Sequence, residues 1–273
     1  MVLTLEDMGF EIEASHHEAS PGQHEIDFRY EPAMHAADNI MTFKLAVKTI
    51  AKRHGMHATF MPKPKSGVSG SGMHINMSLR KDGKNIFADE NDKFGLSQDA
   101  YYFIGGLMKH VYEMTAITNP LVNSYKRLVS GFEAPLNITW SVRNRSPLIR
   151  IPSAVGGGTR IELRSPDCAA NPYLTIALCL AAGLDGMKNK IIPPENIQKN
   201  IFSMSEEEKA ERNITSLPTN LSAAVEAKEQ DAFIQDVLGE HISNVYINSK
   251  KDEWDRYCRA VTQWEVDEYL DKF

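Results

Sequence analysis

Two glutamates, Glu18 and Glu25, lie in a stretch of the chain that predicts a β-hairpin. Residues 9–14 alternate apolar and acidic side chains, residues 26–30 alternate again, and the Ser-Pro-Gly sequence at 20–22 is typical of a turn. Such a hairpin would place the two carboxylates side by side at the base of the turn. Because adjacent carboxylates repel each other, they usually share a divalent cation that takes oxygen ligands. An acidic, solvated hairpin tip is the alternative, and this stretch alone does not decide between the two.

Two later segments, 73–80 and 159–164, also alternate with a period of two, and each has one polar face. The side chains of these polar faces are His74, Asn76, Ser78 and Arg80 in the first segment and Arg160, Glu162 and Arg164 in the second. Three glutamates and one histidine near several arginines are typical of a magnesium or manganese site for phosphoryl transfer. The alternatives are an antiparallel sheet with one solvated face and a cross-strand ladder of charges.

Four further arginines, Arg127, Arg143, Arg145 and Arg150, could bind carboxylates or phosphates. A guanidinium group suits both because it donates two parallel hydrogen bonds. Each of these arginines, taken singly, could equally form a surface salt bridge. The glycine-rich segment 66–72 lacks the Gly-Lys-Ser/Thr ending of a P-loop, so a P-loop nucleotide site is excluded there.

The composition is that of an ordinary globular protein, with 273 residues, 42% apolar residues and 24% charged residues. The net charge of −6 argues against nucleic acid or an acidic membrane as the main partner. Cys168, Cys179 and Cys258 are scattered and odd in number, which favours a reducing cytoplasm over a disulfide framework or a CxxC zinc site. We find no apolar run that could span a bilayer and no basic, apolar leader.

The order of the predicted elements indicates an α+β fold: an antiparallel sheet with a polar active-site face and helices packed on its other side. Strands are expected in the hairpin, at 58–61 and 73–80, near 137–142 and 148–151, and at 159–164. Helices are expected over 36–53, from Ser97 to about 118, from Pro172 to about 186, and over most of 220–271. Ser205 and Glu208 have the spacing of a capping box.

The chain resembles glutamine synthetase of the bacterial type I class over essentially its whole length. The segments that carry the resemblance are Glu13–Glu18, Gly22–Glu25, Gly70–His74, Asn123–Arg127, Gly131–Pro135, Asn144–Pro152, Thr159–Arg164 and Ala170–Tyr173. The resemblance implies one catalytic domain over residues 1–273, with a curved antiparallel sheet and a mostly helical part from about residue 203. It also implies ATP-dependent ligation of glutamate and ammonia to glutamine through γ-glutamyl phosphate, in the cytoplasm, with two or more Mg²⁺ or Mn²⁺ ions.

The resemblance also implies roles for single residues. Glu18 and Glu25 would hold one metal ion, and His74 and Glu162 would hold a second. The glutamate site would contain Arg127, Arg164, Gly70 and Ser69, and the ATP channel would contain Glu13, Tyr30, Asn76, Ser78 and Arg150. Arg145 and Arg160 would face the transferred phosphate, and Glu133 would close over the intermediate and help to bind ammonium.

The sequence departs from the family pattern at several points. The resemblance leads us to expect an N-terminal β-grasp domain and a Glu-x-Glu strand with one further ligand for each metal, and residues 1–273 contain neither. Smaller departures are Ser69 for asparagine, Ser130 for proline, Val155 for a basic residue, and Phe202 where some relatives carry an adenylylated tyrosine. We therefore expect a truncated or split synthetase that is inactive or weakly active unless another chain complements it.

Two other functions remain open from the sequence. A sister ligase would join glutamate to a larger amine with the same fold and metal site. A non-catalytic remnant would bind metal or nucleotide without turnover. Members of the family form stacked hexameric rings. Residues 264–273 resemble the C-terminal tail that connects one ring to the other. For this chain by itself we expect a monomer, a small oligomer or an aggregate.

Overall fold

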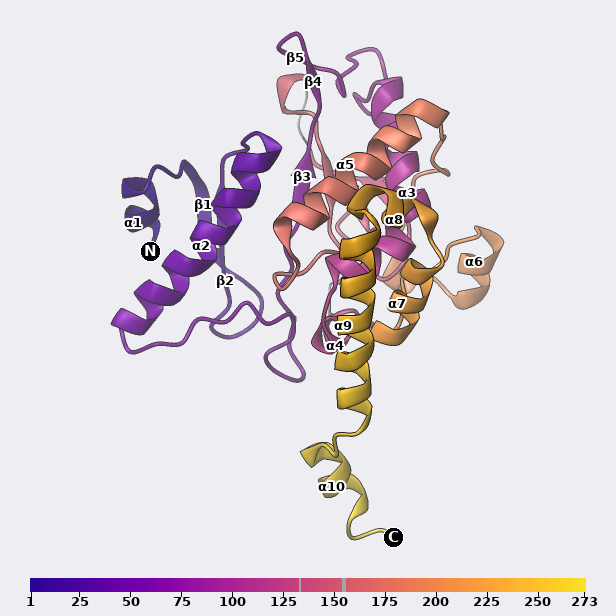
Figure 1. Ribbon diagram of the computed structural model, residues 1–273. Helices are drawn as coiled ribbons and strands as arrows, with labels where there is room; N and C mark the ends of the chain where they lie inside the picture. The colour runs from indigo at the N-terminus through magenta and orange to yellow at the C-terminus, as the bar shows by residue number, and fades with distance from the viewer. Residues whose placement is uncertain (133, 154–155) are drawn as a thin grey trace.

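The centre of the computed structural model, which describes residues 1–132, 134–153 and 156–273, is a four-stranded sheet (Figure 1). Its strands, in spatial order, are β3 (Ile75–Met77), β8 (Ile161–Leu163), β7 (Ile149–Ile151) and β6 (Trp140–Val142). The pairs β3–β8 and β8–β7 are antiparallel, as expected, whereas β7 and β6 are parallel. The expectation of a wholly antiparallel sheet is therefore wrong for β6. Residues 143–148 return the chain to the end of the sheet at which β6 begins, so β7 runs in the same direction as β6, whereas a tight turn would have reversed it.

The predicted hairpin is present, but it forms a sheet of its own. Strand β1 (Ile12–His17) pairs antiparallel with β2 (His24–Phe28), and the helices α1 (Val2–Asp7) and α2 (Ala33–Arg53) lie beside it. This N-terminal unit, indigo to violet in Figure 1, lies on one side of the main body and has a small apolar core around Leu5 and Phe10. A third sheet is the short hairpin of β4 (Arg80–Lys81) and β5 (Lys84–Asn85).

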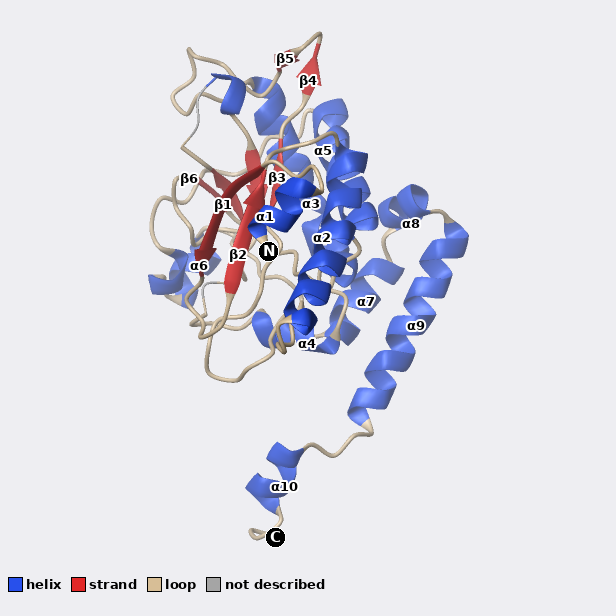
Figure 2. Cartoon of the chain, turned by 90° about the vertical axis from the view of Figure 1, so that its left-hand side faces the viewer, coloured by secondary structure: helices blue, strands red, loops and turns tan. Residues whose placement is uncertain are grey.

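The main core lies between the central sheet and the helices, which Figure 2 shows largely on one side of the strands. These helices are α3 (Gln98–Thr118), α4 (Val122–Arg127), α5 (Pro172–Asn189), α6 (Glu206–Glu211), α7 (Leu221–Glu229), α8 (Ala232–Leu238), α9 (Glu240–Cys258) and α10 (Gln263–Tyr269). Two short 3₁₀ helices, η1 (Gly156–Gly158) and η2 (Ile201–Ser203), complete the described elements. Helix α10 projects beyond the end of α9, away from the body in both views. None of the described helices meets the length and apolarity needed to cross a membrane.

Local signals in the sequence placed the starts of α3, α5 and α6 correctly. The Ser97 hydroxyl caps α3 by accepting from the Ala100 amide, and Ser205 and Glu208 form the predicted capping box of α6. The expected strand at 58–61 is wrong, because this segment has no strand partner in the described part of the chain. There the Thr59 hydroxyl accepts from the Met61 amide at 3.1 Å, a local bond that competes with a strand ladder.

Helices α3 and α5 pack closely because glycines face each other at the crossing. A Cβ atom at Gly106 would overlap the Ala182 carbonyl oxygen and the backbone of Gly186. No side-chain rotation can relieve an overlap with backbone atoms, so the two helices would have to separate.

We expect Gly106→Ala to lower the free energy of unfolding by about 1–3 kcal/mol, because overpacking outweighs the gain in helix propensity. Urea denaturation measures this. Gly157→Ala is the matched control, since a Cβ there would meet open space, and it should stay within about 0.5 kcal/mol of the parent. A Gly106→Ala variant as stable as the parent would contradict the close helix crossing.

Candidate active site

A row of polar residues crosses the central sheet. Asn76 of β3 is paired with Glu162 of β8, Glu162 with Arg150 of β7, and Arg150 with Ser141 of β6. Residues opposite each other in neighbouring strands point to the same face, so this row is the polar face that the alternation predicted. On the other face, Ile75 and Met77 pack against the main core.

Glu162 joins the groups on this face. Its side chain is 7% exposed, its Oε1 lies 3.3 Å from Nδ1 of His74, and its Oε2 accepts from Arg150 at 3.0 Å. Arg164 lies farther away, with Nε 3.9 Å from Oε1. Burial raises the pKa of Glu162. The hydrogen bond with His74 and the charges of His74, Arg150 and Arg164 lower it by a larger total amount, so the pKa lies below its usual value.

His74 is suited to bind a metal ion. Burial lowers the pKa of His74, and so do the charges of Arg164 and Arg127. The hydrogen bond with Glu162 raises this pKa by less, so the neutral imidazole is favoured. Its Nδ1 faces Oε1 of Glu162 across 3.3 Å, so an ion bound by both residues would replace the proton between these two atoms.

The hairpin carboxylates lie together as the sequence predicted. Glu18 and Glu25 share a hydrogen bond that lowers the pKa of Glu18. Burial, then Glu18 and Asp27, raise the pKa of Glu25 to about 8. The pair therefore holds one proton at neutral pH, which is how two crowded carboxylates behave without a cation.

Two residues near this pair were missed from the sequence. One ligand atom each from His16, Glu25 and Asp27 lie within 4.8 Å of one another, and this is the one group of three or more such residues found within that distance in the described part of the chain. His16 is directly opposite Glu25 in the hairpin, and Asp27 follows Glu25 by two residues on the same strand. Asp27 could have been found from the alternation along the strand, because it lies two residues after Glu25. His16 could not, because its place beside Glu25 depends on how the two strands of the hairpin are paired.

The hairpin is fastened to the segment that leads into β3. The Ser20 hydroxyl donates to the Ser69 carbonyl at 2.7 Å, and the Gln23 amide donates to the Gly70 carbonyl at 3.0 Å. The Lys65 ammonium donates to the Pro21 carbonyl at 3.3 Å. Through these bonds Glu18 comes close enough to His74 for the charge of the histidine to lower the pKa of the glutamate.

Arg127 is buried beneath this segment, with 3% of its surface exposed. Its guanidinium group donates to the carbonyl of Ser165 at 2.7 Å and to that of Arg164 at 3.2 Å. A Cβ at Gly70 would lie 2.9 Å from Cγ of Arg127, and one at Gly72 would lie 2.6 Å from its NH2. A Cβ at Gly70 would also overlap the Pro62 carbonyl oxygen, so the close approach of that backbone excludes a side chain there.

Most of the other predicted site residues in the described part of the chain are more exposed to solvent. Arg160 is partly exposed and donates from Nε to Asn76 at 3.1 Å, and Arg164 donates to the Arg145 carbonyl. The Tyr30 ring is 63% exposed and lies near the guanidinium groups of Arg29 and Arg80. Glu13, Ser78 and Arg145 are exposed. Glu133 lies outside the described residues, and so does Val155.

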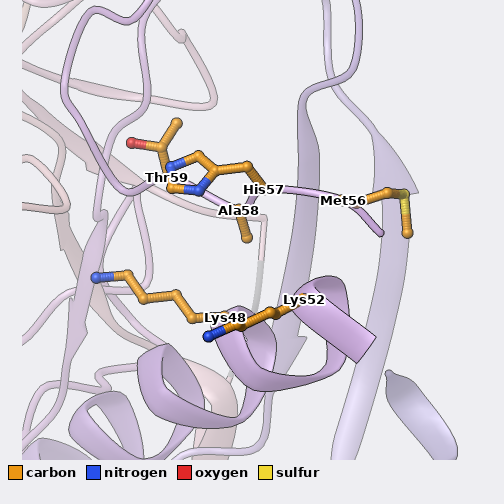
Figure 3. Close-up of a pocket in the computed structure, with 6 residues that line it drawn as sticks. All are labelled: Lys48, Lys52, Met56, His57, Ala58 and Thr59. Carbon is orange, nitrogen blue, oxygen red and sulfur yellow. The ribbon is translucent and has the colours of Figure 1, made fainter. Parts of the chain in front are cut away.

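The hollow in Figure 3 is separate from this site. It has a volume of about 480 Å³ between the end of α2 and the segment that follows it. Its lining residues are Lys48, Lys52, Met56, His57, Ala58 and Thr59, none of which was predicted to bind substrate.

Comparison with known proteins identifies the family. The family described as "Glutamine synthetase, catalytic domain" matches residues 1–269. The chain belongs to the glutamine synthetase family. It is 58% identical to the glutamine synthetase of Clostridium saccharobutylicum and 56% identical to that of Staphylococcus aureus (strain MW2), each over all 273 residues. The chain spans 62% and 61% of the length of these two glutamine synthetases.

Solved structures agree with this assignment. A GmaS/ADP complex matches with a TM-score of 0.90 and 39% identity, over 99% of this chain and 62% of that one. Apo GmaS without ligand matches with a TM-score of 0.88 and 38% identity, over 99% of this chain and 61% of that one.

The proton held by Glu18 and Glu25 gives a pH prediction. The pKa of Glu25 is about 8 in the folded chain and 4.5 in its unperturbed state, so the folded chain binds more protons between these values. Stability contributed by this group is therefore lost as pH rises from about 4.5 to 8. In the presence of a chelator, Glu25→Gln should flatten this fall in the melting temperature, whereas the exposed Glu6→Gln control should keep it. An unchanged slope in Glu25→Gln would contradict the shared proton.

Proposed function

We propose that this chain carries the catalytic centre of an ATP-dependent ligase that joins glutamate and ammonia. The γ-carboxylate of glutamate would attack the γ-phosphorus of ATP, and ADP would leave with the bonding electron pair. Ammonia would then attack the carbonyl carbon of γ-glutamyl phosphate, lose a proton, and expel phosphate to give glutamine. Three observations support the proposal: Glu18 and Glu25 share a hydrogen bond, His74 and Glu162 are in contact, and the charge of His74 acts on Glu18.

The donor set fits hard divalent cations. Three carboxylates and one neutral imidazole are ligands that Mg²⁺ and Mn²⁺ accept. We infer that Glu18 and Glu25 hold one ion and that His74 and Glu162 hold another. The shared proton at Glu18 and Glu25 supports the first, since those carboxylates are closer than two negative charges tolerate. When bound, the ions would neutralise negative charge on the ATP phosphates.

The charge of Arg127 supports a glutamate site. Among the described residues no carboxylate lies within 4.0 Å of its guanidinium group, and Asp167 acts on it over a longer distance. A buried cation without a direct counter-ion is costly, and the carboxylate of a bound substrate would compensate it. We infer that Arg127 and Arg164 bind the substrate carboxylate and that Gly70 and Ser69 contact the amino end.

The remaining roles are those that the family resemblance implies. Arg145 and Arg160 would stabilise charge on the transferred phosphoryl group, and Glu133 would shield the intermediate from water and help to bind ammonium. The residues proposed to contact ATP are Glu13, Tyr30, Asn76, Ser78 and Arg150. The exposed ring of Tyr30 offers a stacking surface for adenine, and the likeness to a GmaS/ADP complex supports a nucleotide in this fold.

We further propose that residues 1–273 form one domain and act within a homo-oligomer in the cytoplasm. The exposed apolar side chains of Trp264 and Leu270 on and after α10 suit a contact with another subunit. The thiols of Cys168, Cys179 and Cys258 are all free, which suits a reducing compartment. Ammonia is favoured over a larger amine, since the chain is 58% and 56% identical to two proteins named glutamine synthetase.

One experiment separates the candidate functions. Calorimetry with Mn²⁺ and ATP is combined with an assay for ATP-dependent glutamine formation in which ammonia competes with methylamine. We expect the parent chain to bind Mn²⁺, and we expect Glu25→Gln and Glu162→Gln each to weaken binding at least roughly 10-fold. Exposed Glu226→Gln is the control and should bind as the parent does.

The outcomes differ for each function. No binding of Mn²⁺ or ATP at millimolar concentration would refute the proposed ligase. Binding without turnover, also after addition of the N-terminal part of a relative, would favour a non-catalytic subunit. Preference for methylamine would favour the sister ligase.

A further inference from the structure

Lys63 is a buried lysine that lies between the glutamate-site loop, defined here as residues 66–72, and helix α4. The residue is 9% exposed. Its backbone amide donates to the side chain of Asn123 at 2.8 Å, and the Asn123 amide group donates back to the Lys63 carbonyl at 3.1 Å. This reciprocal pair fixes Lys63 to α4, the helix that ends at Arg127.

The Lys63 ammonium group contacts two segments that are distant in sequence. It donates a hydrogen bond to the Val68 carbonyl within the glutamate-site loop. It also lies 3.7 Å from the centre of the Phe132 ring, a distance at which a cation is attracted by the aromatic face. One charged group therefore holds the loop and the segment around Phe132 together.

Burial makes the positive charge of Lys63 unfavourable for the stability of the fold. Burial lowers the pKa of its ammonium group, and among residues 1–132, 134–153 and 156–273 no carboxylate lies within 4.0 Å of it. An apolar side chain of similar length would fill the same space without losing solvation of a charge. A lysine at such a position indicates a role beyond packing.

The glutamate-site loop is attached to α4 at both of its ends. Lys63 precedes the loop and is bonded to Asn123, while Gly70 and Gly72 at its other end pass over Arg127. The bond from Lys63 to Val68 fixes the middle of the loop. The bond that Lys63 supplies therefore lies between the two places at which this segment contacts α4.

We propose that Lys63 is a positioning residue for the substrate carboxylate, which holds the glutamate-site loop and Phe132 in place around Arg127. This inference rests on the proposed function, because it assumes that Arg127 and Gly70 bind the amino acid. Lys63 acts on the substrate through the loop.

The test compares Lys63→Met, which keeps the length and removes the charge, with Lys63→Arg, which keeps the charge and can stack on Phe132. Glutamate affinity is measured by calorimetry with Mn²⁺ and ADP present. We expect Lys63→Met to weaken glutamate binding roughly 10-fold, as for loss of a charged hydrogen bond, and Lys63→Arg to restore part of it. Lys84→Met, on the exposed β4–β5 hairpin, is the control and should bind glutamate as the parent does.

Two further measurements separate positioning from folding. The melting temperature of Lys63→Met should stay at or above that of the parent, because an unfavourable buried charge is removed. Amide exchange should become faster in residues 66–72 and stay unchanged in α3. Phe132→Leu should accelerate exchange in the same loop to a smaller extent.

The proposal would be overturned by a Lys63→Met variant that binds glutamate normally, or by one whose melting temperature falls and whose exchange accelerates throughout. If the parent itself binds no glutamate, the proposed function fails. The exchange pattern then still decides whether Lys63 holds the loop: local acceleration supports this, and no change in the loop contradicts it.

Discussion

The buried carboxylate of Glu162 is the interaction on which the polar face of the sheet depends. His74 comes from the strand on one side of it, Arg150 from the strand on the other, and Arg164 from its own strand. Without this carboxylate, the buried Arg164 and the partly exposed Arg150 and His74 would lose the counter-charge that they share, which is unfavourable. The same carboxylate faces Nδ1 of His74 across 3.3 Å. The polar face of the sheet and the proposed metal site therefore both require the carboxylate of Glu162 at this position.

The second constraint is the attachment of the hairpin to the central sheet. The two are separate sheets, so no backbone ladder in the described residues fixes the distance between Glu18 and His74. Side chains from the hairpin turn do so instead, by bonding to Ser69 and Gly70. Because the same segment passes over Arg127, the proposed metal and glutamate sites share one structural support. A change in that segment should alter both sites together.

Local features of the fold could be predicted from the sequence. The cap at Ser97, the capping box at Ser205 and the hairpin around 20–22 depend on residues close together in the chain. The parallel pairing of β6 with β7 could not be predicted, because it depends on the path of residues 143–148 through the molecule. The strand expected at 58–61 failed for a different reason, since the Thr59 hydroxyl satisfies a backbone donor there.

The candidate site shows the same division. Alternation along three segments placed Glu162 and His74 on a polar face, and the structure pairs them. The burial of Arg127 and Lys63 was not predictable, because it arises from glycines and carbonyl groups of distant segments that close over them. His16 was missed because its place beside Glu25 depends on the register of the hairpin. Glu133 lies outside the described residues, so its role stays a prediction.

The most direct test of a metal centre shared by hairpin and sheet is anomalous scattering from a crystal grown with Mn²⁺. The account predicts one peak bounded by Glu18 and Glu25 and a second bounded by His74 and Glu162. A single peak at His16 and Asp27, with none beside Glu162, would contradict it.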